Sequence, residues 1–333
     1  MTVKNSSATR SNLLWALARF RELGIIVFIL VLVVVVSLRT PNFLNLGNFR
    51  DILLDISILL IVALAQTMVI LTHGIDLSVG SSIGLVAMMV AFTIKANPNI
   101  SMVLVVVLGM ALGAVLGTFN GLIIAVGKVP PIIATLGTLS IYRGMVFLYS
   151  KGKWIPSYQL PDAFKMLSKG TPLGIPNIII FAIVVSIIVY YFLNYTRTGR
   201  DIYAVGSNPD AAQYVGIRKQ RIIFLVYALT GVAAGLAGVL WASRFESSQT
   251  NTALGFELQT VAASIVGGVS ISGGVGTVPG VILGALLLGI INNSVTLVRI
   301  SPFWEQAAQG LLILIAVVSD ILIMRGVQRN KSK

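Results

Sequence analysis

The sequence predicts an all-α fold: a polytopic transmembrane bundle of about ten helices, built as one domain over residues 1–333. Composition is the first observation behind this prediction, because 56% of the residues are hydrophobic and only 11% are charged. A soluble domain carries about 25% charged residues, so a chain this apolar cannot cover itself with polar surface. The second observation is that apolar stretches of roughly 20 residues, the length that crosses a bilayer, recur along the chain.

Ten stretches approach the length of a spanning helix. The first follows a basic N-terminal segment, but no small-residue cleavage site comes after it, so we predict an uncleaved span. The fifth is weakened by Tyr142-Arg143-Gly144, and the eighth is short and broken by glycine. The predicted spans are 23–38, 53–72, 80–95, 102–126, 132–149, 176–194, 222–242, 257–272, 277–298 and 303–324.

Basic residues gather in three segments, 1–22, 196–222 and 325–333. Because Lys and Arg are enriched in cytoplasmic loops, we expect both termini and the central loop on the cytoplasmic side of the membrane. Even numbers of predicted spans separate the three segments, which agrees with this placement. The loop 150–173 contains four lysines yet falls outside. It either meets an acidic partner there, or the other loops decide the orientation.

The formal net charge of +13 raises the question of nucleic-acid binding. The basic residues flank apolar spans, however, and form no face with interleaved aromatic residues. We therefore expect these charges to anchor the chain in the lipid bilayer, and we expect no nucleic-acid partner.

Small residues repeat at helical spacing within three predicted spans. Without side chains at such positions, two helix backbones approach closely and pack by dispersion. We therefore predict tight helix–helix contacts and no ligand role at these glycines. They are Gly109, Gly113, Gly117 and Gly121 in one span, Gly231 and Gly235 in a second, and Gly280 and Gly284 in a third.

Two pairs of segments echo one another along the chain. Residues 74–80 (GIDLSVG) resemble 268–274 (GVSISGG), and 113–131 resemble 284–302. Paired glycine-broken segments in two halves mark the central site of many transporters, since unwound backbone at membrane depth is tolerated only in a protein-lined cavity. Taken together, the echoes favour an internal repeat over chance similarity of apolar sequence.

Polar residues within spans are few, and such groups at membrane depth mark function. Asp76 and Ser78 lie at a junction between two predicted helices. They form either a gate or contact for a solute or, as we favour, a cap for the glycine-rich start of the next span. Arg143 is expected to extend its charge toward water along the membrane surface.

A second group of polar residues lies deeper or at a re-entry point. Asn120, Asn292 and Asn293 either line the path of a hydroxylated solute or form hydrogen bonds across helices. Glu257 and Gln259 follow an exterior loop that re-enters the membrane, where they contact a solute or cap a helix. Together with Asp76 and Ser78, these residues are the candidate translocation path or gate.

The chain offers little for catalysis. It contains no cysteine and a single histidine, His73, so thiol nucleophiles and metal sites of clustered histidines are excluded. No nucleophile elbow, HExxH motif or GxxxxGK[ST] phosphate loop occurs. We expect no catalytic residues, no metal, no cofactor and no ATP hydrolysis by this chain. Acidic pairs of the kind that proton-coupled carriers use are also missing from the predicted bundle.

Residues 196–222 form the longest polar run between two apolar blocks. We predict that a short helix in this run lies flat on the cytoplasmic face and receives force from a partner. Its residues, together with GIDLSVG at 74–80, PPIIATLGTLSIYRG at 130–144 and the GGVS and GGVG segments at 267–276, carry a resemblance. Over nearly its whole length the chain resembles the permease subunits of bacterial ABC importers for monosaccharides, the branch with the ribose, xylose, galactoside, rhamnose and autoinducer-2 permeases.

This resemblance implies a cytoplasmic coupling helix with the pattern Glu-Ala-Ala-x-x-x-Gly. Asp210, Ala211, Ala212 and Gly216 match it, with Asp in place of Glu. The two alanines would let the helix enter a cleft of its partner, Asp210 suits the first turn, and Gly216 allows a left-handed turn at the end. The side chain of Asp210 is one methylene shorter than that of Glu, so the docking contact is expected to differ in detail.

The resemblance further implies an inner-membrane permease subunit that moves a monosaccharide or related polyol-like solute. Its expected partners are an ABC ATPase, a periplasmic or lipid-anchored sugar-binding protein, and a second permease copy in a homodimer or heterodimer. One alternative is a self-sufficient secondary sugar transporter, which would use an ion gradient without an ATPase. Another is a membrane-embedded enzyme, for which the sequence shows no catalytic group set.

Overall fold

The computed structural model describes residues 6–172 and 174–298, together with positions 301, 304, 307, 310, 311, 314 and 318. Within these residues the fold is all-α, as predicted, and no strand is present beyond an isolated antiparallel bridge between Ile155 and Ser248. The predicted tenth span, 303–324, lies almost entirely outside the described residues, and the predicted cytoplasmic tail, 325–333, lies wholly outside them.

Eight helices of the described chain are long and apolar enough to cross a membrane, which confirms the predicted polytopic bundle. They correspond to the first seven predicted spans and the ninth. The largest difference is at the first, because its helix continues through much of the basic N-terminal segment. The eight are α1 (Ser6–Arg39), α2 (Leu46–Leu71), α3 (Val79–Ala96), α4 (Met102–Ala125), α5 (Pro131–Ser150), α7 (Asn177–Tyr195), α10 (Lys219–Arg244) and α12 (Val278–Leu297).

The predicted eighth span is a half-length helix. α11 (Phe256–Val266) has 11 residues, and at 1.5 Å per residue it covers about 16 Å, roughly half of the hydrocarbon core. It ends at Val266 with Gly267 as its C-cap, and Gly268 turns the backbone out of the helix with φ +90°. The predicted helical stretch to residue 272 is therefore wrong. The other short elements are the 3-10 helices η1 (Pro41–Leu44) and η2 (Ser157–Gln159) and the helices α6 (Asp162–Lys169), α8 (Arg197–Ser207) and α9 (Pro209–Tyr214).

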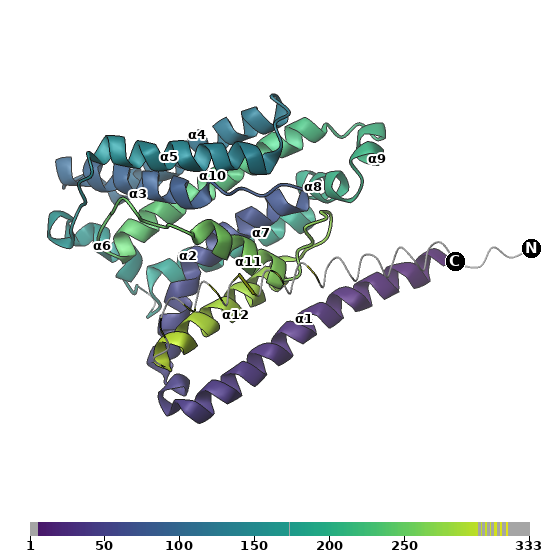
Figure 1. The fold of residues 1–333 in the computed structure, drawn as a ribbon, viewed down its shortest axis with the longest axis horizontal. Coiled ribbons are helices and arrows are strands. Elements are labelled where there is room, and N and C mark those ends of the chain that lie inside the picture. The colour runs from purple at the N-terminus through teal and green to yellow at the C-terminus, as the bar shows by residue number, and fades with distance from the viewer. Residues whose placement is uncertain are drawn as a thin grey trace, which may run out of the picture.

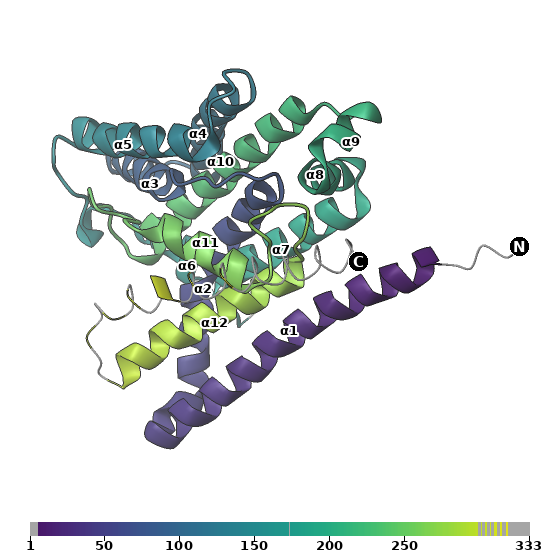
Figure 2. The same ribbon diagram turned by 45° about the vertical axis from the view of Figure 1, so that its right-hand side comes forward.

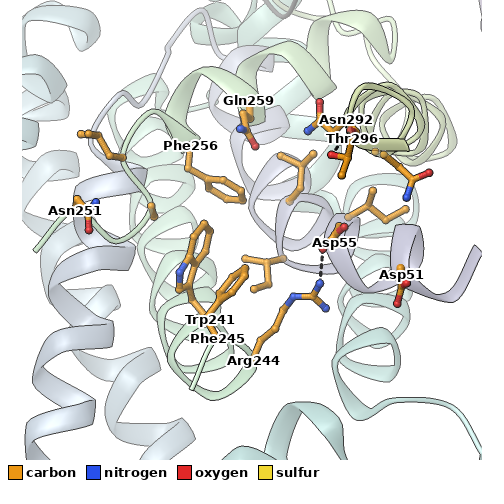
Figure 3. A pocket seen from close by; sticks show the side chains of 17 residues that line it. Asp51, Asp55, Trp241, Arg244, Phe245, Asn251, Phe256, Gln259, Asn292 and Thr296 are labelled. Carbon is orange, nitrogen blue, oxygen red and sulfur yellow. Dashed lines mark hydrogen bonds and ion pairs between the residues drawn. The ribbon is translucent and has the colours of Figure 1, made fainter. Parts of the chain in front are cut away.

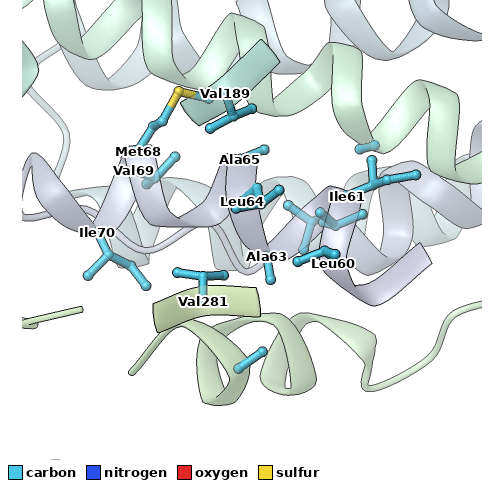
Figure 4. Packing of buried hydrophobic residues seen from close by; sticks show 14 of the residues in the cluster. Leu60, Ile61, Ala63, Leu64, Ala65, Met68, Val69, Ile70, Val189 and Val281 are labelled. Atoms are coloured by element: carbon cyan, nitrogen blue, oxygen red, sulfur yellow. The ribbon is translucent and has the colours of Figure 1, made fainter. Parts of the chain in front are cut away.

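α2 forms the centre of the bundle. In its most apolar stretch 83% of the residues are buried, the largest share of the eight long helices, against 11% in α1. α7, α10, α11 and α12 all pack against α2, and Figure 4 shows the apolar side chains of this core, with Val281 of α12 and Val189 of α7 on opposite sides of α2. α1 runs along α12 at one edge of the bundle, and α3, α4, α5 and α10 form the opposite edge (Figures 1 and 2).

The bundle has two distinct ends, which we name by the short helices that they carry. α7 connects them, because it begins just after α6 and ends just before α8 (Figure 1). At the α6 end, Ser243 near the end of α10 accepts a hydrogen bond from the backbone of Ser168 in α6. At the α9 end lie α8, α9, the end of α2 and the start of α12. Thr277, which caps α12 there, also donates to Glu22 of α1, so the N-terminal half of α1 reaches the α9 end.

The glycine repeats make the predicted close contacts. A Cβ placed on Gly113 of α4 would lie 2.2 Å from the carbonyl oxygen of Gly231 in α10, and the reverse distance is the same. A Cβ on Gly284 of α12 would lie 2.1 Å from the carbonyl oxygen of Ala263 in α11. Any larger residue at these positions would separate the helix pairs, so the prediction of a structural role is confirmed.

The echoed segments are brought together but do not form a simple duplication. His73, just before the first segment, packs its ring against Gly273 of the second. After residues 74–80, the whole of α3 comes before α4, the helix that contains the start of the second echo. After residues 268–274, the corresponding helix, α12, follows with no helix between them. The two echoes therefore require different offsets along the chain, and the predicted repeat is not colinear.

Candidate functional site

A cavity of about 670 Å³ opens at the α6 end, between α2, α10, α11 and α12. Figure 3 shows its wall: Trp241 and Arg244 come from α10, Phe256 and Gln259 from α11, and Asp55 from α2. This volume falls within the roughly 300–1,000 Å³ that small-molecule sites occupy. The cavity therefore has the size for one small solute.

One wall of the cavity carries an ion pair beside aromatic rings. The guanidinium of Arg244 is hydrogen-bonded to the carboxylate of Asp55, and it also lies over the ring of Phe245 with its central carbon 5.5 Å from the ring centroid. Trp241 packs edge-on against Phe256, with ring centroids 5.1 Å apart. Donors, acceptors and apolar ring faces are thus presented within one cavity.

A second cavity of about 510 Å³ adjoins the first at the α6 end. The two share Asp51, Arg244 and Phe245 in their linings. Arg50 and Lys169 line only the second cavity, whereas Gln259 and the two asparagines of α12 line only the first. Arg244, held by Asp55, therefore stands where the two cavities meet.

Three of the predicted path residues line the first cavity: Gln259, Asn292 and Asn293. Asn293 donates from Nδ2 to Oδ1 of Asn48 at 2.8 Å, so it forms a bond across helices as well as lining the cavity. The side-chain oxygens of Asn292 and Asn293 are buried and have no hydrogen-bond partner within the described chain. Both oxygens are shielded from the cavity in this conformation, so a bound solute or water would reach them only after the side chains rotate.

Three other predicted path residues form a closed network away from this cavity. Oδ1 of Asp76 accepts from the backbone N–H of Ser78 at 2.8 Å and from its hydroxyl at 2.7 Å. Nδ2 of Asn120 donates to the same hydroxyl at 2.8 Å. All three side chains are buried, and the network joins the loop before α3 to α4. The favoured cap is wrong, because neither Asp76 nor Ser78 accepts a hydrogen bond from the first turn of α3; Asp76 instead orders the loop that leads into the helix.

Glu257 also points away from the cavity. Its carboxylate lies against α3, where a Cβ on Gly80 would come within 2.2 Å of it. Beside it, Nη1 of Arg143 donates to the carbonyl oxygens of Thr250 at 3.1 Å and Thr252 at 2.8 Å. The expectation that Arg143 extends toward water is therefore wrong. It fastens the re-entering loop before α11 to α5 by donating to these two backbone carbonyl oxygens.

At the other end of the bundle, α9 contains the predicted coupling residues. Asn208 caps the helix by accepting from the N–H of Ala211 at 3.0 Å, and Asp210 lies in the first turn, as predicted. Gly216 has φ +84°, which confirms the predicted left-handed turn. Ala212 corrects the expectation that both alanines face a partner, because its side chain is buried in the core of this chain.

α8 joins α9 to the bundle through backbone-close contacts. A Cβ on Gly206 would lie 1.8 Å from the carbonyl oxygen of Leu71, and a Cβ on Gly274 would lie 2.6 Å from the hydroxyl of Ser207. The hydroxyl of Tyr203 donates to the carbonyl oxygen of Gly276 at 2.9 Å. Burial raises the pKa of Tyr203 to about 12, so its hydroxyl keeps this proton at neutral pH.

The sequence patterns did not predict the Asp55–Arg244 pair, the aromatic wall of the cavity or the exposure of Tyr214 and Val215. Asp55 and Arg244 lie 189 positions apart, near the ends of two predicted spans, and no local pattern pairs them. Tyr214 and Val215 are 92% and 75% exposed. An exposed aromatic residue within a polar loop was a visible signal of a contact surface, since such side chains are enriched at interfaces.

A glycine-packed bundle of helices long enough to cross a membrane, with a solute-sized cavity, has the architecture of a membrane permease. A family model described as "Branched-chain amino acid transport system / permease component" matches residues 48–317, and the chain belongs to this family.

Curated relatives confirm the resemblance to sugar-importer permeases. The ribose import permease protein RbsC of Escherichia coli (strain K12) is 37% identical over 297 residues, which cover 89% of this chain and 92% of that protein. The galactose/methyl galactoside import permease protein MglC of the same strain is 36% identical over 321 residues, covering 92% and 96%. The autoinducer 2 import system permease protein LsrC of Salmonella typhi is 36% identical over 310 residues, covering 93% and 88%. No solved structure matches the chain.

Proposed function

We propose that this chain is the membrane-spanning subunit of an ABC importer that moves a monosaccharide or a related small polyol-like solute. The observation that carries the proposal is the cavity at the α6 end, in which the Asp55–Arg244 pair stands beside Trp241 and Phe245. A sugar presents vicinal hydroxyls, which donate to a carboxylate and accept from a guanidinium, and C–H faces, which pack on aromatic rings. The relatives that import ribose and galactose support the same solute class.

The family description also raises branched-chain amino acids as a solute class. A zwitterion needs an unpaired cation for its carboxylate and an unpaired anion for its ammonium group. In this cavity Asp51 could meet an ammonium group, but the one lining cation, Arg244, is already paired with Asp55 and is not free for a carboxylate. This arrangement favours an uncharged, hydroxylated solute over an amino acid.

We propose that an ABC ATPase docks on α9. Asp210, Ala211 and Tyr214 are exposed there, whereas Ala212 anchors the helix to the core. The ATPase would hydrolyse ATP, and this chain would contribute no catalytic residue, metal or cofactor. A second permease copy, homologous or identical, would complete the transport unit.

The contacts of α8 provide a route from the docking surface to the cavity. Movement of α9 would pass through α8 to Leu71 at the end of α2 and to the loop 267–277 between α11 and α12. α2, α11 and α12 all contribute residues to the cavity wall. Gly206 and Gly274 contact their partners with no space between the atoms. A displacement of α8 would therefore be transmitted to the three helices almost unchanged in size.

The proposed orientation follows from the basic segments. The α9 end would face the cytoplasm of a bacterial cell from its inner membrane, and the basic N- and C-terminal segments are proposed to lie on the cytoplasmic side as well. The α6 end would then face outward and receive solute from a periplasmic or lipid-anchored sugar-binding protein. Exposed lysines at this end, Lys151 and Lys153, would meet acidic residues of that protein.

The test is reconstitution in vesicles with and without the partner ATPase and binding protein. We expect ribose or galactose uptake only in the complete system and only with ATP, and no uptake of leucine. Uptake by this chain alone, driven by an ion gradient, would establish the alternative of a secondary sugar transporter. Leucine uptake by the complete system would overturn the proposed solute class while leaving the importer architecture in place.

A further inference from the structure

A third hollow, a wholly apolar groove of about 240 Å³, lies on the flank of the bundle, between α2, α4, α7 and α10. Its lining exposes no polar surface, and side chains such as Met68, Met110 and Phe192 form its walls. In Figure 4 Met68 of α2 and Val189 of α7 point toward one another across this region. The groove is smaller than the roughly 300–1,000 Å³ of solute pockets and offers no hydrogen bond, so a sugar does not fit its chemistry.

The groove opens toward the bilayer. Ile188, one of its lining residues, is 59% exposed, and its neighbours Ile187 and Val184 on α7 are also largely exposed. A membrane protein presents such apolar helix faces to lipid tails. Water finds no hydrogen-bond partner on these apolar walls. A hydrocarbon chain from the surrounding bilayer would supply the dispersion contacts that the wall atoms lack when the groove is empty.

Basic side chains stand at the α9 end of the same helices. Arg221 lies in the first turn of α10, three helical turns before Val232, which lines the groove. The two residues therefore lie on the same face of α10, separated by about 16 Å along the helix axis. Arg197 begins α8, five positions after Phe192. Both arginines are exposed and form no ion pair within the described chain. A phosphate bound at this end would place its acyl chain at the entrance of the groove.

We propose that the groove binds one acyl chain of an anionic phospholipid, whose phosphate contacts Arg197 and Arg221. The apolar walls recognise the chain, and the two guanidinium groups select a negatively charged headgroup by hydrogen bonding and charge. α7 and α10 both continue into the segment that contains α8 and α9. The bound lipid would therefore brace the helices on either side of the coupling segment, independently of the transported solute.

The test is native mass spectrometry of the full-length protein after incubation with vesicles of phosphatidylglycerol and phosphatidylcholine. The wild type should retain one phosphatidylglycerol per chain, preferred about tenfold over phosphatidylcholine, which corresponds to about 1.4 kcal/mol. Ala233→Phe, which fills the groove, should remove this lipid. Ile187→Phe, on the lipid-facing side of α7 outside the groove, is the matched control and should retain it.

The headgroup is tested separately with the Arg197→Gln/Arg221→Gln double variant. It should lose the preference for phosphatidylglycerol, while Lys219→Gln, on the opposite face of α10 from Arg221, should keep it. A second filling variant, Val185→Phe, replaces Ala233→Phe if that protein does not fold. Retention of lipid by a folded groove-filled variant would overturn the acyl-chain site. Equal binding of the two lipids by the wild type would overturn the anionic headgroup.

Discussion

The two ends of the bundle are held together by different kinds of contact. At the α9 end backbone meets backbone, as where Gly206 touches Leu71 and Gly274 touches Ser207. At the α6 end the cavity wall is held by pairs of side chains, Asp55–Arg244 and Asn293–Asn48. The first arrangement leaves no space, and the second leaves a cavity of about 670 Å³.

This difference suits two different tasks. Contacts between backbone atoms cannot adjust by changing rotamer, so a displacement of one segment is transmitted directly to the segment that it contacts. Side-chain contacts change by rotation about single bonds, so a cavity wall can accommodate a solute without moving its helices. The comparison therefore predicts that small substitutions damage the α9 end through packing and the α6 end through chemistry.

The largest effect is expected at the closest backbone contact. Gly206→Ala would place a Cβ 1.8 Å from the carbonyl oxygen of Leu71, and forced separation should lower the free energy of unfolding by about 3 kcal/mol. Gly137→Ala is the matched control, because its Cβ meets nothing within 4 Å. Thermal unfolding of the purified protein measures both. Equal stability of the two variants would show that the α9 end is not rigidly packed.

A comparably large effect, on transport and not on folding, is expected at α9. Gly216→Val strains a residue with φ +84°, and Asp210→Lys reverses an exposed charge. Either change should reduce uptake by the complete importer at least about tenfold, because each disturbs the proposed docking surface by 1.4 kcal/mol or more. Uptake and solute-stimulated ATP hydrolysis are measured together in vesicles.

Gly174→Val provides the control for backbone strain. Gly174 has φ +74° and open space around it, as Gly216 has, but it lies between α6 and α7 at the α6 end. Uptake should therefore fall in the Gly216 variant and remain in the Gly174 variant. Unchanged solute-stimulated ATP hydrolysis in the Gly216 and Asp210 variants would count against the coupling role.

At the cavity, Arg244→Ala should separate transport from stability. The carboxylate of Asp55 is 57% exposed, so loss of the pair should lower the free energy of unfolding by only about 1 kcal/mol. Uptake of sugar should fall about tenfold, since a charged hydrogen-bond donor to the solute contributes roughly 1.5–3 kcal/mol. Lys95→Ala, at an exposed cation that lines neither cavity, is the control and should retain uptake. Normal uptake by Arg244→Ala would exclude this ion pair from the solute path.

A smaller effect is expected at the asparagine pair. Asn293→Ala leaves Oδ1 of Asn48 without its donor, and loss of this one hydrogen bond should destabilise the protein by about 1 kcal/mol. Asn48→Ala also removes the hydrogen bond from Nδ2 of Asn48 to the carbonyl oxygen of Phe43. The double variant Asn48→Ala/Asn293→Ala should therefore be less stable than Asn293→Ala, but more stable than the sum of the two single effects predicts. Strictly additive effects in this double-mutant cycle would show that the bond contributes no coupling.

The smallest effect concerns pH at the loop after α10. Hydrogen bonds from Lys169 and Ser157 lower the pKa of Glu246 below its usual range. A lowered folded-state pKa stabilises the protein above the unfolded pKa of about 4.3, and this stability is lost as pH falls through the folded value. Unfolding temperatures between pH 6 and pH 3 should therefore decline more steeply in the wild type than in Glu246→Gln. Parallel curves would contradict the prediction.

The sequence by itself determined the fold class and the packing surfaces. Apolar stretches of bilayer length specify helices because backbone polar groups must be satisfied within each segment in lipid. The glycine spacings on α4, α10 and α12 predicted helix contacts correctly, since residues four apart share one helix face. The position of α9 and the left-handed turn at Gly216 also followed from local pattern.

Only the tertiary structure decided which polar residues meet. Asp76, Ser78 and Asn120 close on one another, while Gln259, Asn292 and Asn293 line the cavity, although all six looked alike in sequence. Asp55 and Arg244 pair across 189 positions, and Ala212 turns inward where the motif suggested an exposed face. Local pattern fixes the face of a helix on which a residue lies. The crossing and rotation of helices, set by packing over the whole bundle, decide what that face meets.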